Sequence, residues 1–149
     1  VGSEMCIRDR YNMCEVYMAR TSKKVEKVYQ EANELYNGKN FKDGTALFQH
    51  VLNIFEFCRS ENEKIVALLS EVFNYNLLSE KDFLYRYGNT VYSSVKVLTD
   101  LDDDTEASKL QRIKQNAIAR AVQVAEYKYL MSIHKMDESE FQAKLSSII

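Results

Sequence analysis

Four side chains with chemical potential lie close together in the segment KIVALLSEVFNYN, residues 64–76. They are Ser70, Glu71, Asn74 and Tyr75. On a helix of about 100° per residue they form two i,i+4 pairs beside an apolar stripe. His50 and Glu126 lie on two other apolar segments. An imidazole and two carboxylates can bind a divalent ion or move a proton. The set is therefore either the polar flank of an ordinary amphipathic helix, a working site, or the remnant of one.

The segments that carry these residues have helical spacing. Apolar residues recur at intervals of three and four over 25–35, 47–55 and 65–73, and residues 117–133 are the most apolar stretch of the second half. Residues 90–100 are rich in β-branched side chains and admit a strand, but their helical surroundings favour a helix.

Capping patterns predict where several of these helices begin. Ser60 with Glu63, Ser79 with Asp82, Asn116, and Asp137 with Glu140 are such patterns. Gly88 is expected to end one helix, and the acidic run LDDDTEASK (101–109) to form a loop and a helix N-terminus. The chain has no proline and four glycines, few for a turn-rich β protein. These patterns predict one compact all-α domain, a bundle of about seven helices.

Length and charge exclude several classes of function. The 149 residues fit one domain, and the net charge of −2, with Lys and Arg spread along the chain, gives no basic surface for nucleic acid. No segment approaches the roughly 20 apolar residues of a membrane span. Cys6, Cys14 and Cys58 lack metal-site spacing, so we expect reduced thiols and a cytoplasmic protein.

The first ten residues, VGSEMCIRDR, resemble a translated sequencing adapter of the kind found at the ends of metagenomic gene predictions. We therefore expect residues 1–10 to be a disordered artefact and residues 11–149 to form the domain. The natural start would be Met13, Met18 or a position upstream. The final AKLSSII leaves an apolar pattern unfinished, which suggests truncation there as well.

Three stretches together resemble the HD-domain hydrolases of the RelA/SpoT type, which remove pyrophosphate from the guanosine alarmones ppGpp and pppGpp. They are KDGTALFQH, KIVALLSEVFNYNLLSEKDFLYRYGNTVYSSVKVLT and RIKQNAIARAVQVAEYKYLMSI. The resemblance covers roughly residues 25–136 and keeps the order and spacing of the family's landmarks. It implies an HD-domain-like helical fold.

The resemblance also implies a metal site whose residues have changed. In the family, a His, an adjacent His-Asp pair and a later Asp hold a divalent ion, usually manganese. His50 matches the first position, Ser70 and Glu71 stand at the His-Asp pair, and Glu126 replaces the later Asp. Serine is a poor substitute for imidazole as a metal ligand, so we expect this site to be weak or lost.

The positions implied for water activation have changed too. Asn74 and Tyr75 stand where the family has a catalytic Glu-Asp pair, Phe41 replaces a basic residue, and Leu130 replaces an Asn. An amide cannot act as a base, and a tyrosine of pKa about 10 is poorly matched to neutral pH. We therefore expect no useful alarmone hydrolysis.

The favoured hypothesis is a catalytically inactive HD-domain homologue, retained as a nucleotide-binding or protein-interaction module without a cofactor. In the first case Phe41 stacks on the base of a guanine nucleotide and Lys42 or Lys128 contacts phosphate. Core or loop packing explains Phe41 equally well, and such lysines are more often simply solvated.

The alternative is a nucleotide pyrophosphohydrolase with an altered site. His50, Glu71 and Glu126 would hold Mn²⁺ or Mg²⁺, with Ser70 binding a water. A hydrogen-bonded core histidine at position 50, in a helical protein with no cleft function, is the remaining interpretation.

Overall fold

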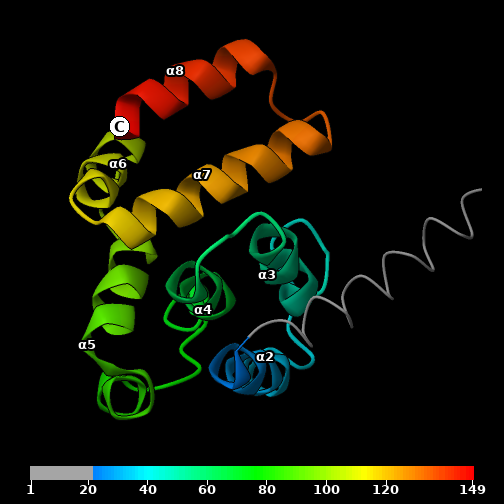
Figure 1. The fold of residues 1–149 in the computed structure, drawn as a ribbon, viewed down its shortest axis with the longest axis vertical. Helices are drawn as coiled ribbons and strands as arrows, with labels where there is room; N and C mark the ends of the chain where they lie inside the picture. The colour runs from blue at the N-terminus through cyan, green and yellow to red at the C-terminus, as the bar shows by residue number, and fades with distance from the viewer. Residues whose placement is uncertain (1–21) are drawn as a thin grey trace, which may run out of the picture.

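The computed structural model describes residues 22–149, and within that range it contains seven helices and no strand (Figure 1). The helices are α2 (Lys23–Leu35), α3 (Leu47–Phe55), α4 (Glu61–Leu69), α5 (Glu80–Leu98), α6 (Glu106–Lys114), α7 (Ala117–Ser132) and α8 (Glu138–Ile148). The predicted all-α class is confirmed, and residues 90–98 are helical despite their β-branched composition.

The helix starts follow the local capping signals. Ser60 and Glu63 form a reciprocal capping box at α4, and the side chains of Ser79, Asn116 and Asp137 accept hydrogen bonds from the first turns of α5, α7 and α8. Gly88 interrupts α5 with φ 85° and ψ 174°, a conformation that only glycine adopts readily. Because these signals lie within a few residues of each helix end, the sequence alone could indicate them.

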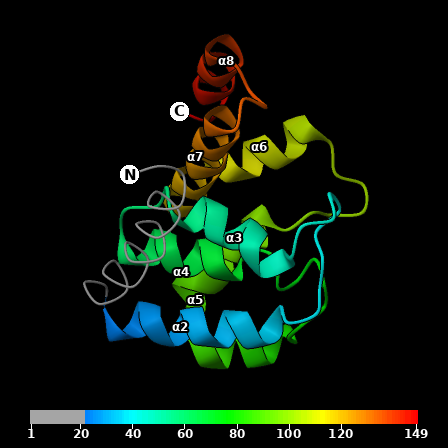
Figure 2. The same ribbon diagram turned by 90° about the vertical axis from the view of Figure 1, so that its right-hand side faces the viewer.

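Helices α4 and α7 form the centre of the bundle. Helix α4 contacts α2, α3, α5 and α7, and its residues 65–69 are all buried, so it is a core helix rather than an amphipathic one. Helix α7 contacts α3, α4, α5, α6 and α8, and it connects the part of the bundle containing α2 to the part containing α8 (Figures 1 and 2).

Helix α4 ends at Leu69, so the expectation of one helix through Tyr75 is wrong. Tyr36, the C-cap residue of α2, donates its hydroxyl proton to the Leu68 carbonyl at 2.6 Å. In a continuing helix that carbonyl would accept from the amide of Val72, which bonds to Leu69 instead at 3.2 Å. Residues 70–76 form consecutive turns instead of continuing the helix, and the last of them, Asn76, has a left-handed conformation with φ 54°.

No helix among residues 22–149 is long and apolar enough to cross a membrane. Cys58 is buried, and burial raises the pKa of its thiol to about 12, which keeps it protonated. The proposed artefact at residues 1–10, together with Cys6 and Cys14, lies outside the described residues.

Candidate functional site

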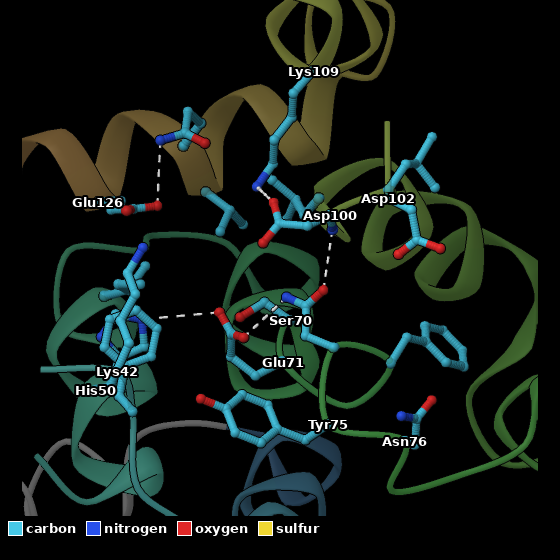
Figure 3. A pocket seen from close by; sticks show the side chains of 18 residues that line it. Lys42, His50, Ser70, Glu71, Tyr75, Asn76, Asp100, Asp102, Lys109 and Glu126 are labelled. Carbon is cyan, nitrogen blue, oxygen red and sulfur yellow. Dashed lines mark hydrogen bonds and ion pairs between the residues drawn. The ribbon is translucent and has the colours of Figure 1, made fainter. Parts of the chain in front are cut away.

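A cleft of about 600 Å³ opens between α3, the turns after α4, the α5–α6 loop and α7 (Figure 3). Its volume lies within the range of small-molecule and cofactor sites. The side chains that line it are those of Phe41, Lys42, His50, Ile54, Ser70, Glu71, Phe73, Asn74, Tyr75, Asn76, Leu98, Asp100, Leu101, Asp102, Lys109, Val122, Gln123 and Glu126.

Eight of the ten residues singled out from the sequence line this one cleft, although they come from three separate stretches of the chain. The exceptions are Leu130 and Lys128. Lys128 lines a separate depression of about 330 Å³ with Arg120 and Ile148. Two residues along a helix correspond to a rotation of about 200°, so Lys128 and Glu126 point to different sides of α7.

An amide bridge fixes one wall of the cleft. The Nδ2 of Asn74 donates to Oε2 of Glu71 at 3.0 Å, and its Oδ1 accepts from the backbone amide of Asp100 at 3.0 Å. Asp100 in turn pairs with Lys109 of α6 at 2.5 Å. Asn74 therefore connects the turns after α4 to the α5–α6 loop, and it orients the carboxylate of Glu71 in a way that a second carboxylate at this position would not.

His50 is covered on one side by Phe41. Their rings stack with centroids 3.7 Å apart and planes at 8°, and the Nζ of Lys42 lies 5.5 Å from the Phe41 centroid. One face of the Phe41 ring, which was predicted to stack on a base, thus contacts His50. Burial lowers the pKa of His50, which favours the neutral imidazole at neutral pH. Its Nε2 lies 3.9 Å from Oε1 of Glu71, too far for a hydrogen bond.

Glu126 occupies the opposite wall, on α7, and is held in a similar way. The Nε2 of Gln123, one turn earlier, donates to Oε2 of Glu126 at 3.3 Å. Burial raises the pKa of both Glu71 and Glu126, and the charge of Glu126 raises that of Glu71 further. Both carboxylates are therefore costly to ionise in this environment.

The cleft does not present a metal-binding set. Among residues 22–149, no three His, Cys, Asp or Glu side chains are arranged to hold a metal ion. The hydroxyl of Ser70 donates to the Ala67 carbonyl at 2.9 Å and so helps to end α4. His50, Glu71 and Glu126 line the same cleft, but the residues present do not fit the manganese site of the family they resemble.

Tyr75 is not placed as a general base. Its hydroxyl donates to the carbonyl of Asn40 at 3.2 Å, and desolvation raises its pKa above the ordinary value. The phenol therefore remains protonated at neutral pH. Because the amide of Asn74 is hydrogen-bonded through both its nitrogen and its oxygen, neither Asn74 nor Tyr75 supplies a group that takes a proton.

Sequence reasoning missed the contribution of the α5–α6 loop and of Gln123. Asp102 lines the cleft from the acidic run 101–109, Asp100 lines it from the end of the stretch 90–100 that was expected to be helical, and Lys109 joins them from α6. Nothing local to residues 100–109 indicated this, because the loop reaches the site only through tertiary packing. Gln123 was detectable, since it precedes Glu126 by three residues and shares its helix face.

Comparison of the chain with protein-family models and with curated proteins gave no match.

Proposed function

We propose that this chain is a catalytically inactive relative of the RelA/SpoT-type HD hydrolases that binds a guanine nucleotide without hydrolysing it. One observation carries the proposal: seven of the eight positions that the resemblance assigns line a single cleft of about 600 Å³, within the volume range of small-molecule and cofactor sites.

The chemistry of the same positions argues against turnover. Hydrolysis of a pyrophosphate ester needs a polarising ion and a group that takes a proton from water. No three-ligand metal set occurs within residues 22–149, and the amide of Asn74 is bound to Glu71 and to Asp100. The supports are thus a ligand-sized cleft and the lack of the two groups that hydrolysis requires there.

Lys42 supports a phosphorylated ligand. It lines the cleft, its side chain is exposed, and no carboxylate of the described residues lies within ion-pairing distance of it. Lys109, the other lysine of the cleft, is already paired with Asp100. A phosphate that approaches Lys42 would therefore gain a charge-assisted contact without breaking an ion pair.

Calorimetric titration of the purified protein with ppGpp and with GDP tests the proposal. We expect saturable one-to-one binding to the wild type, and binding about 5- to 30-fold weaker to Lys42→Ala, because one charge-assisted contact is lost. Lys128→Ala, which removes a lysine from outside the cleft, should bind like the wild type. A flat titration with both nucleotides would contradict the proposal.

A further inference from the structure

The depression that contains Lys128 has an apolar floor. Val124 of α7 lines it together with Leu145 and Ile148 of α8, and Phe57 lines it from the loop before α4. Its volume of about 330 Å³ lies at the lower end of the range for ligand pockets. A hollow apolar surface of this size suits a side chain inserted from another protein molecule, as anchor residues are at interfaces.

Three basic side chains surround this floor, and none of them has an ionic partner. Arg59 lies before α4, and Arg120 and Lys128 lie on α7. No carboxylate of residues 22–149 lies within ion-pairing distance of any of the three. Glu63 also lines the depression, but its carboxylate is used by the capping box at Ser60. The complementary surface is therefore an apolar side chain accompanied by carboxylates.

The α5–α6 loop of the same chain presents this combination. Leu101 is 51% exposed, and the exposed side chains of Asp102 and Asp103 form no ion pair with any residue that the structure describes. The acidic residues on either side of these three, Asp100 and Asp104, already have basic partners on α6. Residues 101–103 thus offer one apolar side chain and two unpaired carboxylates to another molecule.

The loop and the depression lie on opposite sides of the molecule. Figure 2 shows the loop before α6 projecting on the side of the bundle opposite the chain end marked C, and Ile149 at that end lines the depression. The two surfaces can therefore meet only between two copies of the chain. A net charge of −2 leaves little long-range repulsion between such copies.

We propose that the depression binds residues 101–103 of a second copy of this chain. Leu101 of one molecule contacts the apolar floor of the next, and the carboxylates of Asp102 and Asp103 meet the three basic side chains around it. The contact is heterologous, so assembly continues beyond a dimer. One loop in one depression buries less surface than a permanent interface, so we expect a dissociation constant on the order of 10⁻⁴ M. The inference does not depend on nucleotide binding.

Sedimentation of the purified full chain without nucleotide tests the proposal, at concentrations from about 10 µM to about 1 mM, on either side of the expected dissociation constant. At about 50 mM salt the average mass should rise with concentration and pass twice that of the monomer. At about 500 mM salt the association should weaken severalfold, because ions screen the charges of an exposed contact. Association that strengthens with salt would contradict the proposal, since screening cannot strengthen an attraction between opposite charges.

Charge reversals assign the association to these two surfaces. Lys128→Glu changes the depression and Asp103→Lys changes the loop, and neither residue lines the cleft. Each variant should weaken the association about 3- to 30-fold, because an exposed attraction becomes a repulsion. Lys24→Glu and Glu34→Lys are the matched controls: they make the same reversals at exposed positions of α2, outside both cavities, and should associate like the wild type.

A mixture of the two variants tests the head-to-tail arrangement. The intact loop of Lys128→Glu can dock in the intact depression of Asp103→Lys, so the mixture should associate more strongly than either variant alone. The proposal is overturned by a monomer at every concentration, by a mass that stops at two copies, by an association that the two reversals do not both weaken, or by a mixture no stronger than its components. Unchanged thermal unfolding midpoints establish that a lost association is not a lost fold.

Discussion

At the level of single residues, the cleft contains two carboxylates, those of Glu71 and Glu126, whose burial lowers the stability of the folded state. Glu71 and Glu126 are desolvated carboxylates whose pKa values are raised, and no cation compensates either at hydrogen-bonding distance within the described residues. Proteins usually retain such groups where a ligand uses them, since apolar substitutes would be more stable. Their destabilising effect can be measured without knowing the ligand.

We predict that Glu126→Gln stabilises the protein at pH 7.5 by about 0.5–2 kcal/mol, the usual range for replacing a destabilising group. The folded-state pKa of Glu126 lies above its unfolded value, so the folded state binds the proton more tightly. Wild-type stability therefore falls as the pH rises from the unfolded pKa of about 4.3 through the raised folded pKa.

Urea denaturation at pH 4 and pH 7.5 checks this. The gain in Glu126→Gln should be present at pH 7.5 and should shrink toward zero at pH 4, where the carboxyl is largely protonated. Glu34→Gln, which makes the same substitution at an exposed position of α2, is the matched control. An equal gain at both pH values would show that ionisation is not its cause.

At the scale of elements, the end of α4 determines where the site residues lie. The hydroxyl of Tyr36 donates to the Leu68 carbonyl and also accepts a hydrogen bond from the amide of Glu71 at 3.4 Å. It therefore links the last turn of α4 to the residue that begins the cleft wall. Because Tyr36 is 1% exposed, no water would take the place of its hydroxyl as the partner of these two backbone groups.

We predict that Tyr36→Phe destabilises the protein by about 1–3 kcal/mol, the cost of leaving buried backbone groups unsatisfied. The expected measurement is a lower urea midpoint with an unchanged denaturant slope. Tyr75→Phe is the matched control, since its hydroxyl contacts the Asn40 carbonyl in a more exposed position. If the two variants lose the same stability, the proposed role of Tyr36 at the end of α4 is wrong.

Gly88 interrupts helix α5. Gly88 has φ 85° and ψ 174°, and a Cβ there would meet no atom within 4 Å, so the cost of Gly88→Ala is conformational rather than steric crowding. We expect a loss of about 1–3 kcal/mol in thermal or urea unfolding. Ser93→Ala, at an exposed helical position of the same element, should change stability by less than about 0.5 kcal/mol.

At the scale of the whole molecule, the sequence predicted what depends on nearby residues. The all-α class, the capping box at Ser60 and the break at Gly88 follow from short-range patterns, and all three are present. The end of α4 did not follow, because the side chain responsible, Tyr36, lies 32 residues before the carbonyl it binds. Eight residues that line the cleft were candidates from the sequence. Asp100 was not, because only tertiary packing brings it to the cleft.

Under the proposed function, the whole cleft would hold a guanine nucleotide without cleaving it. We would incubate the purified protein with ppGpp and added Mn²⁺ and measure bound nucleotide and released pyrophosphate in the same samples. We predict that ppGpp is bound and recovered intact. Release of pyrophosphate at a rate that His50→Ala abolishes would contradict it.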